Sequence, residues 1–236
     1  MKREIIYGSR PVIEALKSGR RKVFEIFDAV GDQEVANAAG ARGVNPKRVS
    51  RQRVDELSGG GVHQGIAARV EPYPYSGLAE ILASPEPLVL VLDGVTDPRN
   101  LGAVLRTAEG AGASGVVIPR DRAAGVTAAA VKASAGGSEH VRVARETNLK
   151  RAIEAMKEAG LWVYAAEAAG TPYAQLDFAG PVGLVFGSEG RGVRRLVREA
   201  CDGTVSIPML GNVGSLNVSV AAAVLLYEVR RQRGWP

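Results

Sequence analysis

The stretch LVLVLDGVTDPRNLGAVLRTAEGAGASGVVIP (88–119) decides the fold of this chain. Residues 88–93 form a nearly continuous apolar run typical of a buried strand, and residues 115–119 form another. Between them, over 100–111, apolar residues recur at helical spacing. Near-continuous apolar strands that alternate with helices are typical of a parallel sheet covered on both faces. The stretch therefore predicts an α/β fold.

The same alternation continues to the end of the chain. Four further strands are predicted, at 140–144, 161–167, 182–187 and 204–208. Four further helices are predicted, at 126–135, 147–160, 193–201 and 216–232. We therefore expect one α/β domain over residues 88–236.

The first third of the chain has its own shorter pattern of helices and strands. Helices are predicted at 11–19, 32–42 and 51–59, and strands at 22–30 and 65–72. Four prolines in PYPYSGLAEILASPEP (72–87) stiffen the chain and resist continued secondary structure, with room for a short helix at 77–83. We expect a small α/β domain over 1–72 and a linker over 73–87.

The charge of the chain is concentrated near its start. The net charge is +5, and residues 1–75 carry 13 Lys and Arg against 9 Asp and Glu. Such an excess favours contact with nucleic acid phosphates, but a solvated surface without a partner explains it equally well.

Cysteine and histidine are scarce in this sequence. The single cysteine, Cys201, excludes an internal disulfide and fits a reducing compartment, so we expect a cytoplasmic protein. The two histidines are too few for a histidine-rich metal site: His63 is expected to organise a turn and His140 to begin a strand. No apolar run is long enough to predict a membrane span or a signal peptide.

Three glycine- and asparagine-rich segments carry the functional signal, at 93–112, 185–193 and 206–221. Each lies between an apolar strand pattern and a helical one, where glycine permits close approach and free backbone N–H groups bind polar ligands. They predict a site formed mostly by main chain. The run GAGASG (110–115) matches a dinucleotide fingerprint formally, but it ends a helix, which argues against a nicotinamide oxidoreductase.

Together these segments resemble the three motifs of the SpoU family of RNA ribose 2′-O-methyltransferases, in the SPOUT superfamily. The matching positions are Asn100, Gly102 and Arg106, then Gly187, Glu189 and Gly190, then Ile207, Pro208, Ser215, Leu216, Asn217 and Ser219. IYGSRPVIEAL (6–16) and HQGIAA (63–68) extend the resemblance over nearly the whole chain. VTAAAVKASAGGSEHV (126–141) is similar to the subgroup that methylates a guanosine of large-subunit ribosomal RNA.

The resemblance implies a fold and a cofactor. It implies an N-terminal domain similar to ribosomal RNA-binding proteins, and a C-terminal domain with a deep trefoil knot that binds S-adenosylmethionine. It assigns cofactor contacts to Gly187, Ile207 and Leu216. It also implies a homodimer with the active site at the subunit interface and a ribosomal RNA partner. The composition, and not the resemblance, leads us to expect no metal and no membrane.

The resemblance assigns catalysis to Arg106, as either a base or an electrostatic stabiliser. Asn100 would orient Arg106 or the ribose, Glu189 would order the knot loops, and Ser215 and Asn217 would contact the target nucleotide. Ordinary helix capping and turn geometry is the alternative for the asparagines and the serine. A surface pair with Glu109 is the alternative for Arg106.

Two further questions stay open at the level of sequence. Val218, Ala221, Leu225 and Val229 recur near helical spacing, so this stripe faces either a partner subunit or the sheet. The rivals to a ribosomal RNA methyltransferase are a tRNA methyltransferase of the same fold and an RNA-binding assembly factor without catalysis.

Overall fold

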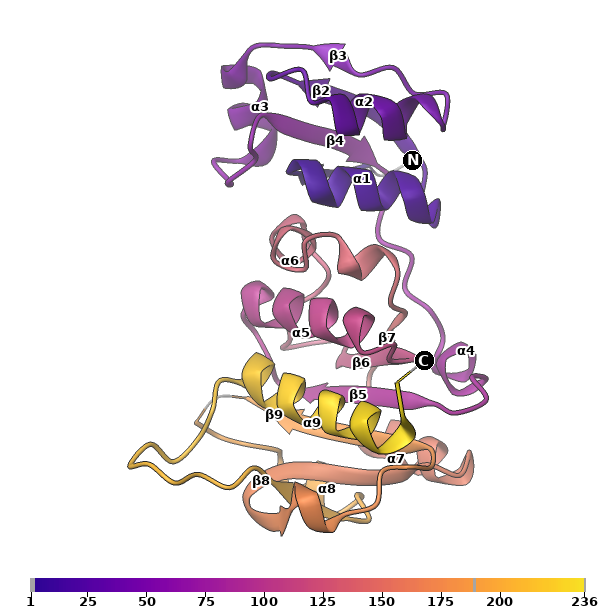
Figure 1. Cartoon of the computed structure of the whole chain (residues 1–236), viewed down its shortest axis with the longest axis vertical. Coiled ribbons are helices and arrows are strands. Elements are labelled where there is room, and N and C mark those ends of the chain that lie inside the picture. Colours follow the sequence, from indigo (N-terminus) through magenta and orange to yellow (C-terminus); the bar gives the residue numbers. More distant parts are fainter. Residues whose placement is uncertain (1–2, 189, 236) are drawn as a thin grey trace.

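The computed structural model describes residues 3–188 and 190–235 and contains two sheets, one in each half of an elongated molecule (Figure 1). The N-terminal domain has the strand order β1-β4-β2-β3, with β1 and β2 antiparallel to β4. Its strands are β1 (Glu4–Tyr7), β2 (Val23–Asp28), β3 (Lys47–Arg48) and β4 (Ile66–Val70). Its helices are α1 (Ser9–Ser18), α2 (Gln33–Gly40) and α3 (Arg51–Ser58).

The C-terminal domain is built on a parallel sheet of order β10-β8-β9-β5-β6-β7. Its strands are β5 (Leu88–Asp93), β6 (Gly115–Pro119), β7 (Val143–Glu146), β8 (Trp162–Pro172), β9 (Val182–Gly187) and β10 (Gly203–Ser206). The other elements are α4 (Leu78–Leu82), α5 (Pro98–Gly110), α6 (Ala128–Ala133), η1 (Gly137–Glu139), α7 (Leu149–Glu158), η2 (Tyr173–Gln175), α8 (Arg195–Arg198) and α9 (Val218–Arg233). The predicted parallel α/β sheet is confirmed.

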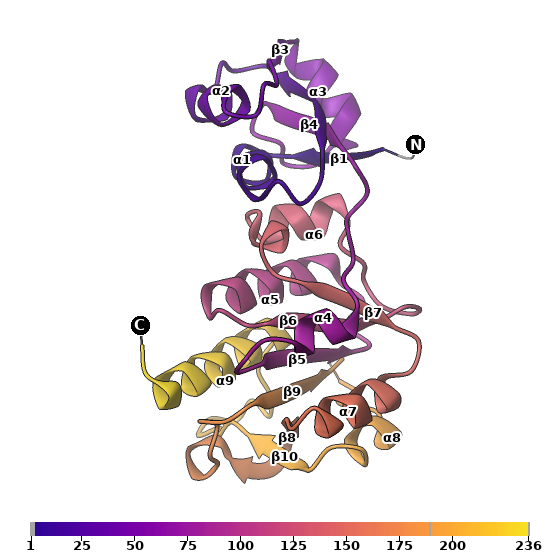
Figure 2. The ribbon, with the colours of Figure 1, turned by 90° about the vertical axis from the view of Figure 1, so that its right-hand side faces the viewer.

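Helices cover both faces of this sheet because its central strand is apolar on both sides. Leu90 and Leu92 of β5 belong to the core under α5 and α9, whereas Val89 and Val91 belong to the core under α7. Figure 2 shows α5 and α9 on one side of the strands and α7 on the other. β5 is fully buried along its length, which explains why its sequence reads as one apolar run.

The apolar stripe of α9 faces the sheet and not a partner. Val218, Leu225 and Val229 are at most 6% exposed and pack into the core of their own domain. The interpretation of this stripe as a dimer surface is therefore wrong. Helical spacing identifies an apolar face, but it does not say which apolar surface the face covers.

Two local predictions fail where turns redirect the chain. The strand expected at 140–144 is β7, and it starts only at Val143 because Gly137–Glu139 form the 3-10 turn η1. His140 therefore ends η1, with Nε2 2.8 Å from Glu14 Oε2 of the N-terminal domain. The first strand, β1, had no clear sequence pattern of its own.

Candidate active site

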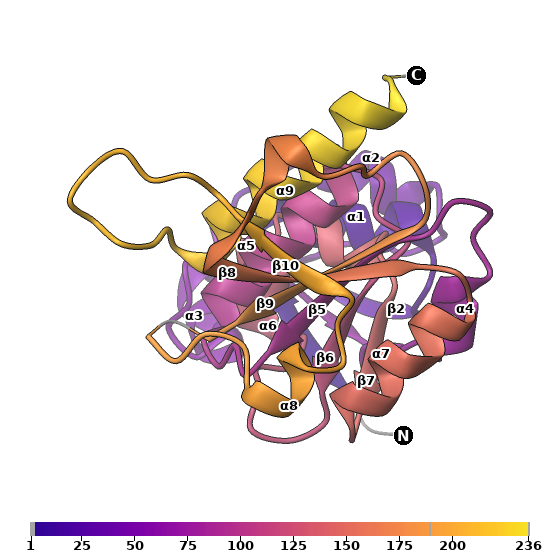
Figure 3. The ribbon, with the colours of Figure 1, turned by 90° about the horizontal axis from the view of Figure 1, so that it is seen from below.

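The loops that follow β9 and β10 meet a distorted part of β8 and enclose a pocket of about 300 Å³. Figure 3 shows that one of these loops, the long loop between β10 and α9, projects away from the sheet. The residues lining the pocket are Ala166, Glu167, Ala168, Phe186, Gly187, Ser188, Gly190, Gly192, Val205, Ile207, Met209, Gly214, Ser215, Leu216, Val218 and Ala221. Four of the residues named from the sequence thus line one pocket: Gly187, Ile207, Ser215 and Leu216.

Glycine at 187 is required by a backbone crossing. A Cβ atom at this position would lie 1.9 Å from the carbonyl carbon of Gly192 and 2.2 Å from the nitrogen of Val193. Backbone atoms cannot move aside as a side chain can, so any larger residue would displace the loop. The loop is closed by a hydrogen bond of 2.9 Å from Gly192 N to Ser188 O. This wall of the pocket is therefore main chain.

A second part of the lining comes from an interruption of β8 that the sequence did not predict. Thr204 of β10 pairs with Ala165, but the next residue, Val205, pairs with Thr171. Residues 166–170 have no partner in the register between β8 and β10, and Ala166, Glu167 and Ala168 line the pocket. A glycine at 170 is needed there, because a Cβ would lie 2.7 Å from the carbonyl carbon of Val205. The sequence signal that could have indicated this interruption is a glycine near the end of an alanine-rich strand.

A buried carboxylate holds the base of the glycine loop. Asp93 ends β5 with its side chain fully buried, and Oδ2 accepts a hydrogen bond of 2.8 Å from the backbone nitrogen of Arg194. Oδ1 accepts from Nε of the same arginine at 2.7 Å. Charge-assisted bonds of this kind are stronger than neutral ones. Asp93 therefore fixes the chain just after the loop that contains Gly187 and Gly192.

Asn100 and Asn217 connect the first and third motifs. The side chain of Asn217 donates to Oδ1 of Asn100 at 3.0 Å, while its own Oδ1 accepts from Ser219 N at 2.9 Å. The second bond caps the start of α9. Capping and a contact between motifs therefore coexist at Asn217, directly beside the pocket residues Ser215 and Leu216.

Arg106 lies on the exposed side of α5 and does not line the pocket. Six residues separate it from Asn100, a rise of about 9 Å along the helix. Within residues 3–188 and 190–235, no ion pair joins Arg106 to Glu109, so the surface-pair interpretation has no support. Glu189 lies outside the described residues.

His63 and Cys201 are held within the fold and do not line the pocket. His63 is buried, its Nδ1 accepts from Gly65 N at 2.9 Å and its Nε2 lies 2.7 Å from Asp55, as expected of a residue that organises a turn. Burial raises the pKa of the Cys201 thiol to about 12.

The described residues include no group of His, Cys, Asp and Glu that could hold a metal, and no helix among them is long and apolar enough to cross a membrane.

Comparison with known proteins finds a matching family model for each domain. The SpoU rRNA Methylase family matches residues 87–227, and the RNA 2′-O ribose methyltransferase substrate-binding family matches residues 5–76. The chain belongs to the SpoU rRNA methylase family.

Individual relatives extend over the full chain. It is 44% identical over 241 residues to the 23S rRNA (guanosine-2′-O-)-methyltransferase RlmB of Escherichia coli K12, covering 98% of this chain and 99% of that protein. It is 43% identical to the putative TrmH family tRNA/rRNA methyltransferase YacO of Bacillus subtilis, covering 98% and 96%. The solved structure of the SpoU methyltransferase AviRb from Streptomyces viridochromogenes with AdoMet superposes with a TM-score of 0.84 at 26% identity, covering 97% and 89%.

Proposed function

We propose that this protein is an S-adenosylmethionine-dependent methyltransferase that modifies the ribose 2′-hydroxyl of a guanosine in 23S ribosomal RNA. One observation carries the proposal: residues from the second and third motifs line one pocket, and Asn217 bonds the first motif to it. The high identity to RlmB over both domains supports the ribosomal substrate.

The pocket fits the proposed cofactor. Its wall at Gly187 presents main chain where a Cβ would collide, while Phe186, Ile207 and Leu216 supply apolar lining. Sites for small molecules combine such apolar surfaces with a few fixed polar groups. When bound, S-adenosylmethionine supplies an electrophilic methyl group. We assign its binding to Gly187, Ile207 and Leu216.

Arg106 would act on the hydroxyl as a fixed positive charge. A guanidinium stays protonated in proteins, which makes it a poor base but a good stabiliser of a developing alkoxide. Asn100 and Asn217 hold each other and fix the start of α5, the helix that carries Arg106. Ser215 lines the pocket and is assigned a polar contact with the target nucleotide. Glu189 keeps its proposed role in ordering the glycine loop.

We also propose a homodimer with a knotted C-terminal domain. Arg106 lies outside the pocket lining, so a second subunit that covers this edge is needed to complete the site. Leu210 of the projecting loop is fully exposed, and Val220 and Tyr227 of α9 are nearly half exposed. These residues, and not the buried stripe of α9, are candidates for the contact.

The division of labour follows from the two domains. We assign residues 1–72 to RNA recognition, residues 73–87 to the connection and residues 88–236 to catalysis, with the protein acting in the cytoplasm on ribosomal RNA. The basic excess of the first third supports the first assignment.

The decisive experiment supplies the purified protein with labelled S-adenosylmethionine and either 23S ribosomal RNA or total tRNA, and maps the modified ribose. We expect one guanosine of 23S ribosomal RNA to be modified. Modification of tRNA alone would favour the rival methyltransferase. Cofactor binding without transfer to either RNA, or to assembling ribosomal particles, would favour an RNA-binding assembly factor.

A further inference from the structure

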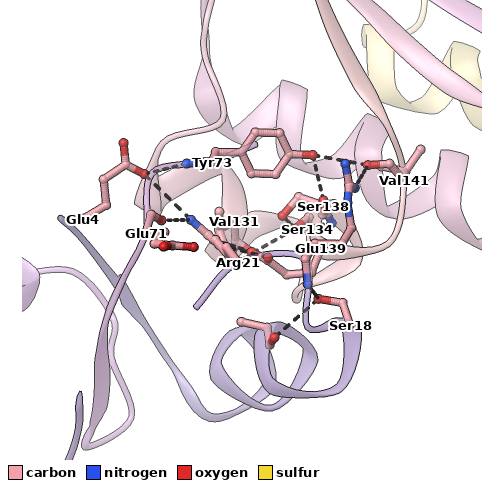
Figure 4. A network of polar contacts seen from close by, with 12 residues as sticks. Glu4, Ser18, Arg21, Glu71, Tyr73, Val131, Ser134, Ser138, Glu139 and Val141 are labelled. Carbon is pink, nitrogen blue, oxygen red and sulfur yellow. Dashed lines mark hydrogen bonds and ion pairs between the residues drawn. The ribbon is translucent and has the colours of Figure 1, made fainter. Parts of the chain in front are cut away.

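The two domains meet at a buried ion pair between Arg21 and Glu139, which we call the domain joint together with Tyr73 and Ser138. Arg21 lies between α1 and β2, and Glu139 lies in η1 of the C-terminal domain. Both side chains are 1% exposed, and the guanidinium contacts both carboxylate oxygens, with Nε donating to Oε2 at 3.0 Å (Figure 4).

Further contacts between the two domains surround this ion pair. The hydroxyl of Tyr73 donates to the backbone oxygen of Ser138 at 2.8 Å, and the Arg21 guanidinium lies 5.7 Å from the centre of the Tyr73 ring. Arg20 donates to the backbone oxygen of Val141 at 2.8 Å. A desolvated ion pair contributes little net stability, but it tolerates only one geometry. The joint therefore fixes an orientation more than it adds affinity.

The turn that holds Glu139 separates the N-terminal domain from the catalytic helix by a single layer of backbone. A Cβ on Gly136 would lie 2.7 Å from Cβ of Glu14 in α1. A Cβ on Gly137, the next residue, would lie 3.2 Å from Cα of Arg106 in α5. One face of η1 thus rests on the N-terminal domain, and the other rests on the residue assigned to catalysis.

We propose that Arg21 and Glu139 are positioning residues, which hold RNA bound by the N-terminal domain in register with Arg106. This inference rests on the proposed function. Because η1 contacts both elements directly, a rotation of the N-terminal domain moves bound RNA relative to α5. The pair acts on the placement of the target ribose and does not touch the cofactor pocket.

The test compares Glu139→Gln with the double variant Arg21→Met/Glu139→Met in the full-length protein. Removing the charge of Glu139 leaves the buried Arg21 with Glu4, at 3.7 Å, as its remaining ion-pair partner among the described residues, whereas replacing both Arg21 and Glu139 with apolar side chains keeps the packing. We expect Glu139→Gln to lower kcat on 23S ribosomal RNA at least tenfold, with KM for RNA and cofactor affinity changed less than twofold. The double variant should recover most of the lost kcat.

A second variant tests the other face of η1 and does not depend on the ion pair. Gly137→Ala pushes against Arg106 through a contact of 3.2 Å and should also lower kcat with little change in cofactor affinity. Glu154→Gln, which removes an exposed pair with Lys150 in α7, serves as the control and should behave as wild type.

The outcomes separate this inference from the proposed function. If wild type does not methylate ribosomal RNA, the proposed function fails. If wild type is active and both Glu139→Gln and Gly137→Ala keep its kcat and its target nucleotide, the positioning role is refuted. A double variant that recovers none of the kcat lost in Glu139→Gln would also refute a coupled pair. If Glu139→Gln fails to fold, the kcat values of the double variant and of Gly137→Ala still test the positioning role.

Discussion

The cofactor pocket and the domain joint achieve precise geometry by opposite means. The pocket is bounded by closely approaching backbones, and a Cβ at Gly187 in its lining, or at Gly170 beside it, would lie within 3 Å of main-chain atoms. The joint is formed by long charged and aromatic side chains that meet across two domains. A site of the first kind fails when an atom is added, and a site of the second kind fails when an atom is removed.

The sharpest test of this contrast adds one methyl group to the pocket. In Gly187→Ala the new Cβ would lie 1.9 Å from the backbone of Gly192, so the loop must move and the pocket must change shape. We expect no measurable binding of S-adenosylmethionine in calorimetry, and a loss of stability of about 3 kcal/mol or more. Gly180→Ala, at a position with open space around it, is the matched control. Normal cofactor affinity in Gly187→Ala would mean that the crossing is not rigid.

Removing Arg106 tests whether the pocket and the catalytic group are separable. Arg106→Ala should lower kcat by about 10²–10³-fold, the effect expected for a lost electrostatic stabiliser. Cofactor affinity should stay within a factor of two, because Arg106 does not line the pocket. Arg106→Lys keeps the charge but loses the planar fork, so substantial activity in this variant would show that charge alone suffices. Single-turnover assays on 23S ribosomal RNA measure both variants.

Asp93, next to the pocket, is an exception, since there a side chain fixes the backbone. In Asp93→Asn the amide keeps one acceptor for Arg194 but loses the negative charge. We expect about 1–3 kcal/mol of lost stability and a cofactor affinity weakened about tenfold. Thermal unfolding with and without cofactor measures both effects. An unchanged affinity would show that the glycine loop holds its shape without this anchor.

The contact between Glu14 and His140, close to the domain joint, gives the smallest expected effect. This effect on stability depends on pH. Burial tends to raise the pKa of Glu14, but hydrogen bonds from His140 and Lys17 outweigh it, so this pKa lies below its ordinary value of 4.5. A carboxyl group whose pKa is lowered by folding stabilises the folded state above pH 4.5. This contribution is lost as the pH falls through the pKa of the folded state. Glu14→Gln should therefore cost less than about 1 kcal/mol at pH 6 and become nearly neutral near pH 3. Urea unfolding at both pH values checks this, and a cost that grows in acid would contradict it.

Sequence patterns predicted one of these two regions much better than the other. The strands at 88–93, 115–119 and 182–187 agree with β5, β6 and β9 because burial on both faces leaves a local apolar signature. The motif glycines similarly identify the pocket. Arg21 and Glu139, in contrast, are 118 positions apart and ordinary in their local sequence, so no pattern joins them before the domains are folded. The excursion at 166–170 was missed because a bulge depends on the register of its neighbour.

The order of the pocket residues along the chain also sets the timing of synthesis. The strands of the N-terminal domain are complete at Val70, whereas the last pocket residue is Ala221. At about 5–20 residues per second, translation needs roughly 8–30 s to cover this interval. During that time the domain proposed to recognise RNA is already synthesised, while the proposed site for the methyl donor is incomplete. The nascent protein can therefore meet RNA before it is able to modify it.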